Sequence, residues 1–214
     1  MTSERSPMAS ERSPRLAKLD HTALDPAQRA LYDAIVDGPR ALRPFPLTDA
    51  AGNLEGPFNA MLLSPVLGEA LQALGAAIRY RSALSVRARE IATLVVARVW
   101  ESAFEWYAHE AIARSVGFDQ DEIDTLRDQC VDGLTDPGDR LVAATATALA
   151  ARGDLTDQEF AAALDGLGAP GVFELMTLVG YYATLALQLR VFRVGAPGDA
   201  RPDPEPADRA PEAP

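Results

Sequence analysis

The sequence predicts an all-α fold, on three observations. Several segments open with Asp, Ser or Thr, followed either directly by Pro or three residues later by Glu, as helix N-termini do. No stretch alternates apolar and polar residues, and no Asn-Gly or Asp-Gly turn joins two β-branched runs. A chain of 214 residues with 48% hydrophobic residues is long enough for one domain with its own core. We therefore expect a helical bundle.

The capping signals divide the chain into eight expected helices. The first begins at Asp25-Pro26 and stops at Gly38-Pro39, and the prolines and glycines of residues 40–60 indicate a loop or short turns. Five further helices are expected at 64–81, 86–100, 102–116, 119–130 and 136–151. A seventh is expected to begin at the capping box of Thr156 and Glu159, and an eighth covers 172–194.

The folded domain is expected to cover residues 20–195. The chain opens with two near-identical copies of seven residues, MTSERSP and MASERSP, so Met8 is an alternative start to Met1. A repeat of Ser, Arg and Pro cannot bury a core, which predicts a disordered leader over residues 1–19. Residues 196–214 hold six prolines and no large apolar residue, which predicts an extended tail.

Composition and charge exclude several classes of function. A net charge of −11 argues against binding to nucleic acid and to anionic membrane surfaces. No uninterrupted apolar run reaches the roughly 20 residues of a membrane span, and the N-terminus lacks the apolar block of a secretory signal. We expect a soluble, cytoplasmic protein whose partner is a small-molecule substrate.

Few cysteine and histidine side chains are available to bind a metal. The single cysteine, Cys130, forms no internal disulfide and excludes a Cys-rich zinc site, and there are only two histidines. We expect no metal and no cofactor. A metal held by Glu90, Glu105 and His109 is an open alternative, although the spacing matches no common zinc motif.

Polar residues are concentrated in one otherwise apolar region, residues 86–117. Glu105 and His109 are four positions apart and therefore share one face of a helix. A carboxylate one turn from an imidazole can hold its tautomer and share a proton with it, which is the minimal equipment of general acid–base catalysis. Alternatively, Ser102 and Glu105 form a capping box, and His109 is a half-buried structural residue. Glu90 could simply be an exposed acid near a helix N-terminus.

Three segments of the chain resemble one known family. They are GPFNAMLLSP at 56–65, the run from RYRSALSV to ARSVG at 79–117, and ELMTLVGYYATLAL at 174–187. Over about residues 20–195 the chain is similar to the carboxymuconolactone decarboxylase family, which includes the alkyl hydroperoxidase D-like proteins. The resemblance implies a helical bundle of that type.

The resemblance also assigns motif positions. The thiol branch of the family has a glutamate, then Cys-x-x-Cys, then a histidine four residues after the second cysteine. Here the glutamate and histidine correspond to Glu90 and His109, while Ser102 and Glu105 replace the cysteines. Peroxide reduction through this motif needs both thiols, so we do not expect it. Cys130 lies outside the motif and is expected to be a small core residue.

Other residues are candidates for ligand binding. Arg79, within a group that includes Arg81, Arg87 and Arg89, could bind a substrate carboxylate, or these arginines could cap helices and pair with surface acids. Further side chains could line a pocket or belong to the core or a subunit contact, namely Asn59, Trp106, Tyr107, Tyr181 and Tyr182.

The favoured hypothesis is a cofactor-independent acid–base enzyme, a decarboxylase, lactone-opening enzyme or isomerase acting on a small organic acid or natural-product intermediate. The alternatives are a non-catalytic member that binds a ligand or partner, and redox chemistry through Cys130. The final helix is apolar on nearly every side, which predicts a homo-oligomer. The resemblance implies a trimer or hexamer in which a neighbouring chain helps to close the site.

Overall fold

The structure, a computed structural model, describes residues 14–38 and 44–197. Most of the predicted leader and tail therefore lie outside the described residues. The described elements, in chain order, are η1 (His21–Ala23), α1 (Pro26–Val36), α2 (Pro57–Met61), α3 (Pro65–Arg81), α4 (Val86–Val99), α5 (Ala103–Ser115), α6 (Gln120–Arg127), η3 (Val131–Gly133), α7 (Pro137–Arg152) and α8 (Asp157–Phe192). Between residues 44 and 197 the extended pairing consists of one isolated bridge, Thr48 with Leu54. The all-α prediction is confirmed.

Local capping chemistry explains where the helices begin. Asp25, Asp119 and Thr156 each accept a hydrogen bond from the backbone N–H three residues on, and the side chain of that residue bonds back. These capping boxes satisfy N–H groups that have no partner inside the helix. The three helices therefore begin where the sequence predicts, because each capping side chain and its partner lie within one turn of each other.

Two helices differ from the expectation. α2 is a five-residue helix that starts at Pro57, within the segment expected to be loop or turns. The last two expected helices are continuous in α8, which contains a non-helical break at Gly168, with φ of 67°. Pro170 follows two residues later and has no amide hydrogen, so the two arms of α8 meet at a kink.

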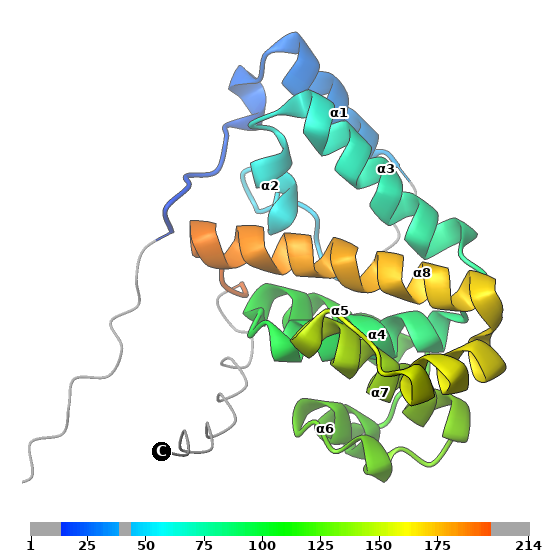
Figure 1. Ribbon diagram of the computed structural model, residues 1–214. Coiled ribbons are helices and arrows are strands. Elements are labelled where there is room, and N and C mark those ends of the chain that lie inside the picture. The colour runs from blue at the N-terminus through cyan, green and yellow to red at the C-terminus, as the bar shows by residue number, and fades with distance from the viewer. Residues whose placement is uncertain (1–13, 39–43, 198–214) are drawn as a thin grey trace, which may run out of the picture.

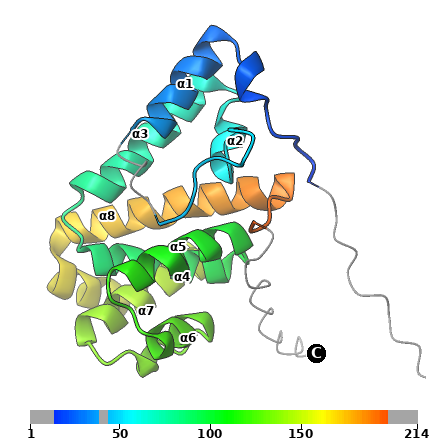
Figure 2. The same ribbon diagram turned by 180° about the vertical axis from the view of Figure 1, so that it is seen from behind.

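The long helix α8 runs through the middle of the molecule. Helices α1, α2 and α3 lie on one side of it, and α4, α5, α6 and α7 lie on the other (Figure 1), as the reverse view also shows (Figure 2). α4 packs against α5, α7 and α8, and its Ile91, Leu94 and Val96 are fully buried. The centre of the core therefore lies between α4 and α8.

α8 is long and apolar enough, by length and composition, to cross a membrane. Half of its most apolar 18-residue stretch is buried within the protein.

The folded part begins before the predicted boundary at residue 20. Arg15 donates its backbone N–H to the carbonyl oxygen of Phe192, at 2.8 Å, near the end of α8. Leu19 donates its N–H to the side-chain oxygen of Asn59 in α2, also at 2.8 Å. Residues 14–19 are thus tied to α2 and α8 by backbone groups, which the composition of the leader could not indicate.

Candidate active site

A sharp turn between α4 and α5 sets up the polar centre of the molecule. Glu101 adopts a left-handed conformation with φ of 53°, and Ser102 donates its N–H to the carbonyl oxygen of Ala97 at 2.8 Å. The turn directs α5 back along α4, against which it packs. Glu90 of α4 then faces His109 of α5.

Glu90 and His109 form a buried hydrogen-bonded pair. Nδ1 of His109 lies 2.7 Å from Oε2 of Glu90, and the residues are 4% and 3% exposed. The other oxygen of Glu90 lies 3.6 Å from a guanidinium nitrogen of Arg79. A carboxylate that accepts from Nδ1–H leaves the proton-accepting lone pair on Nε2. The alternative in which Glu90 is an exposed acid is wrong.

Tyr182 of α8 packs edge-on against the imidazole of His109. The ring centroids are 5.0 Å apart and the planes are inclined at 86°. The ring of His109 is therefore held by Glu90 through a hydrogen bond and by Tyr182 through packing.

Glu105 is buried without a hydrogen-bond partner among the described residues. It is 3% exposed, and neither carboxyl oxygen, nor Oγ of Ser102 beside it, has a partner of suitable geometry. Burial raises the pKa of Glu105 well above 4.5, an effect that the neighbouring Ser102 hydroxyl only partly opposes. Burial therefore favours the protonated form of Glu105.

Two sequence-based interpretations of Glu105 are corrected. Ser102 is the N-cap of α5 but makes no side-chain capping hydrogen bond, so the capping box is absent. Glu105 also makes no hydrogen bond to His109, whose carboxylate partner is Glu90.

A narrow cavity opens beside Glu105 and His109, where α2, α5 and α8 meet. It encloses about 360 Å³ of empty space, open solvent at its mouth included, of which about 20 Å³ admits the centres of water molecules. Its lining consists of the two polar residues and a largely aromatic wall made by Phe45, Pro57, Phe58, Phe104, Ala108, Tyr181, Tyr182 and Leu185. A space of this size holds a water molecule or the tip of a ligand.

The sequence and the fold both match known proteins. Residues 65–148 match the model of the carboxymuconolactone decarboxylase family. Over these residues the chain is similar to that family. The match covers the motif region, a shorter stretch than the 20–195 expected from the resemblance. Among curated proteins, none matches the sequence.

The fold agrees with a solved structure from Ralstonia eutropha JMP134, described as an alkylhydroperoxidase AhpD core and an uncharacterized peroxidase-related protein. The two chains are 15% identical, with a TM-score of 0.69 over 87% of this chain and 93% of the other. At this identity the likeness concerns the fold alone.

Two candidate binding residues have structural roles away from the cavity. Trp106 donates its indole N–H to Glu110 at 2.6 Å, and Arg127 lies over its ring. Asn59 bonds the backbone of Leu19 and Ala17, so it anchors the N-terminal segment. Neither side chain lines the cavity, and the prediction that they bind a ligand has no support from their positions.

The arginines have separate partners and do not line the cavity. Arg79 pairs with Glu90, and Arg87 pairs with Glu122 and Asp139. Arg89 bonds the carbonyl oxygen of Leu84. The arginine cluster therefore divides into separate structural contacts.

Two further expectations concern metals and thiols. Within residues 14–38 and 44–197, no group of three His, Cys, Asp or Glu side chains is arranged to hold a metal ion. Cys130 is exposed, and the expectation that it is a core residue is wrong. It follows α6 at its C-terminal end, where the chain leaves the core.

Sequence reasoning named Tyr181 and Tyr182, which line the cavity, but missed the phenylalanines of the aromatic wall. Phe45 and Phe58 come from the expected loop, and Phe104 precedes Glu105 on α5. Aromatic residues are common in any core, so nothing in the sequence separates those that line a cavity from those that pack against one another.

Proposed function

We propose that this protein is a cofactor-independent acid–base enzyme. One observation carries the proposal: Glu105, a buried carboxyl whose pKa is raised by burial, and His109, an imidazole hydrogen-bonded to a carboxylate, line the same largely apolar cavity. General acid–base catalysis requires one group that donates a proton and one that accepts a proton in the same site. Decarboxylation, lactone opening and double-bond isomerisation can all be catalysed by such a pair of proton donor and proton acceptor.

Each polar residue has a distinct part in the proposed mechanism. Nε2 of His109 takes a proton from the substrate or from a water, and Glu90 stabilises the imidazolium that forms. Arg79 lies 3.6 Å from the second carboxyl oxygen of Glu90 and partly balances its charge. Glu105 supplies the proton that the leaving group or product carbon needs. Tyr182 keeps the imidazole in place and is proposed to touch the ligand.

Thiol-dependent peroxidase activity is not supported. Ser102 and Glu105 occupy the two positions that resemble the cysteines of the thiol branch, and neither side chain can form or resolve a sulfenic acid. Cys130, the remaining thiol, does not line the cavity.

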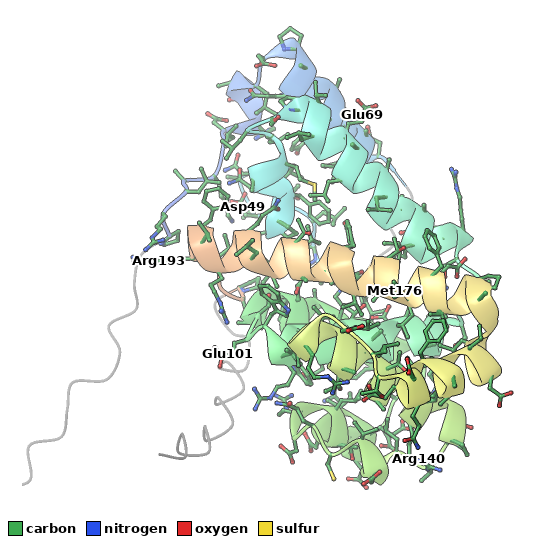
Figure 3. All side chains as sticks on the ribbon, viewed as in Figure 1. Asp49, Glu69, Glu101, Arg140, Met176 and Arg193 are labelled. Atoms are coloured by element: carbon green, nitrogen blue, oxygen red, sulfur yellow. The ribbon has the colours of Figure 1, made fainter. Side chains whose placement is uncertain are left out.

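Turnover measurements on matched variants test the proposal. Purified protein is assayed against small lactones, β-keto acids and unsaturated carbonyl compounds across a range of pH. Replacement of His109 by Ala or Glu105 by Gln should lower kcat by about 10²-fold or more. The control is Glu69→Gln, the same chemical change at an exposed site on α3 (Figure 3). Unchanged turnover in both active-site variants would rule out Glu105 and His109 as the catalytic residues.

The alternative is a non-catalytic protein that binds a ligand in the same cavity. The inner cavity is small, so a substrate or any other ligand larger than a water enters only if the aromatic wall moves. Saturable binding without turnover of any substrate class would support this alternative.

We further propose that the protein is a soluble, cytoplasmic homo-oligomer, a trimer or hexamer. Large apolar side chains are exposed on α3 and α8, among them Val66, Leu67, Phe173, Met176 (Figure 3) and Leu187. Exposed apolar surface of this kind is typical of subunit contacts. Light scattering should give a multiple of 22.9 kDa, and Phe173→Asp should reduce it. A monomer with full activity would contradict the proposal and place the complete site within one chain.

A further inference from the structure

We propose that α2 is the part of the cavity wall that moves to admit a ligand, and that Asn59 is the positioning residue that keeps it closed by binding the N-terminal strap. The strap is the segment of residues 14–19, which runs from the C-terminal end of α8 to α2 (Figure 1). Any ligand must enter the cavity, whether the site catalyses a reaction or only binds, so this role of Asn59 does not depend on the proposed function.

The small size of the cavity requires a wall that moves. Only about 20 Å³ of it admits the centres of water molecules, so nothing much larger than a water fits while the wall keeps its position. The parts of the wall made by α5 and α8 belong to long helices whose inner faces form the core. Pro57 and Phe58 belong instead to α2, which has only five residues. Moving α2 therefore disturbs the core least.

The N-terminal end of α2 is weakly held by its own helix. Gly56 is the N-cap, with φ of 59°, and no side chain caps the helix. Phe58 donates its N–H to the carbonyl oxygen of Glu55 at 3.3 Å, which is long for a hydrogen bond. A helix of five residues is not stable by itself in water. Pro57 and Phe58 are therefore held over the cavity by contacts with other segments.

The strap supplies two of these contacts through Asn59. Oδ1 of Asn59 accepts the N–H of Leu19 at 2.8 Å, and Nδ2 donates to the carbonyl oxygen of Ala17 at 3.2 Å. Asn59 is 6% exposed and directly follows Phe58, which lines the cavity. Both hydrogen bonds join a side chain of α2 to the backbone of the strap, so they must break before this end of α2 moves outward.

The strap is itself anchored on both sides of these bonds. Before them, Arg15 bonds the backbone of Phe192 at the end of α8. Between them, Nζ of Lys18 lies 2.9 Å from Asp49 and 2.6 Å from Glu55, in the loop that leads into α2. Asp49 lies beside α2 (Figure 3). The strap is thus fixed to α8 and to the loop, and through Asn59 it fixes α2.

The C-terminal end of α2 is held independently of the strap and can serve as the pivot. Gln28 of α1 donates its side-chain N–H to the carbonyl oxygen of Leu62 at 3.1 Å. Gly68 of α3 approaches so closely that an added Cβ would overlap the carbonyl oxygen of Met61. Gly56, at the opposite end, has no Cβ and can absorb a change in backbone angles. Opening then turns α2 about Met61 and Leu62 and moves Phe58 away from the cavity.

Loosening the strap should make ligand binding tighter rather than weaker. A ligand that binds only when α2 is open has an apparent Kd equal to its intrinsic Kd divided by the open fraction. Loss of a contact that exists only in the closed state raises that fraction and so lowers the apparent Kd. A side chain with a merely structural role would leave binding unchanged or weaken it.

Binding of benzene, an uncharged molecule that fills apolar cavities, tests the proposal. In calorimetry at pH 7.5, Asn59→Ala should bind benzene about 10-fold more tightly than the natural protein. Asn59→Asp, which keeps the acceptor for Leu19 but loses the donor, should fall between the two. Lys18→Met, at a partly exposed position, should lower the Kd by about threefold.

Hydrogen exchange measured by mass spectrometry locates the motion. Exchange should become faster in residues 57–63 of Asn59→Ala and Lys18→Met and stay unchanged in α4. The strap holds the first of these segments and makes no contact that positions the second.

Controls separate the strap from a general loss of stability. Arg87→Met breaks ion pairs on the other side of α8, and Arg152→Met breaks an exposed ion pair with Glu159, 2.6 Å long. Neither should change the Kd for benzene. Ala108→Leu, added to Lys18→Met, fills part of the cavity and should abolish benzene binding.

Unchanged or weaker benzene binding in folded Asn59→Ala would overturn the proposal, and Lys18→Met decides in the same way if Asn59→Ala does not fold. Absence of measurable binding in every variant, binding that survives Ala108→Leu, or faster exchange spread evenly over all helices would overturn it as well. None of these measurements involves turnover, so failure of the proposed acid–base function remains distinguishable.

Discussion

Nδ1 of His109 lies 2.7 Å from Oε2 of Glu90, although 19 positions separate the two residues in the sequence. The contact joins α4 to α5 in the buried centre of the molecule, where both side chains are withdrawn from solvent. The orientation of the proposed base is therefore set by a residue on a different helix, and Glu105, one turn away on the same helix, remains available for another role.

Glu90→Gln should lower kcat by about 100-fold with little loss of folded protein. An amide of the same size can still contact His109, but it has no charge to stabilise an imidazolium. Steady-state kinetics together with a thermal unfolding curve check this. If kcat keeps its natural value while the variant is folded, Glu90 does not assist the base.

The stability of the natural protein should fall as pH rises above 4.5. Burial raises the pKa of Glu105 in the folded state, so the folded protein holds this proton more tightly than the unfolded chain. Stability from this group is complete below the unfolded pKa and is lost as pH rises through the folded pKa. Urea unfolding at pH 5 and pH 8 should show a smaller difference for Glu105→Gln than for the natural protein. The same difference in both proteins would mean that Glu105 ionises freely.

Gly56→Ala should destabilise the protein and disturb the cavity. Gly56 has φ of 59°, and a Cβ there would overlap the ring of Phe104, which lines the cavity. Backbone strain and overpacking together cost about 2–4 kcal/mol. Chemical denaturation measures the loss. Gly153→Ala is the control, since it has a positive φ but no atom within 4 Å of the added Cβ, and it should cost less.

Arg87→Met should destabilise the domain by about 1–3 kcal/mol while leaving turnover unchanged. Arg87 bonds Asp139 at 2.5 Å and also pairs with Glu122, which ties α4 to α6 and α7. Its loss leaves the mostly buried Asp139 carboxylate without this partner. Equilibrium unfolding and the turnover assay check the two halves of the prediction. A lower turnover in the folded variant would show that the ion-pair group also shapes the site.

Cys130→Ser should change neither turnover nor peroxide consumption. The thiol is exposed and does not line the cavity. Activity is compared with and without a thiol-blocking reagent. A loss of peroxide consumption in the variant would establish redox chemistry outside the proposed site.

The sequence by itself predicted the helical class, most helix N-termini and the resemblance to the family. Asp25, Asp119 and Thr156 mark the starts of their helices because each cap is completed within one turn, by residues that are close in the sequence. The resemblance likewise singled out Glu90 and His109 as candidate site residues, with Ser102 and Glu105 at the positions of the two thiols. These are local properties, readable from a short window of residues.

Only the tertiary structure decided which groups meet. Spacing along one helix favoured Glu105 as the partner of His109, but the turn at Glu101 brings Glu90 of α4 to the imidazole instead. The sequence also gave no indication that Cys130 is exposed. The physical reason is that helix formation depends on hydrogen bonds between residues four apart, whereas contacts between helices depend on how their buried faces pack, which involves the whole core.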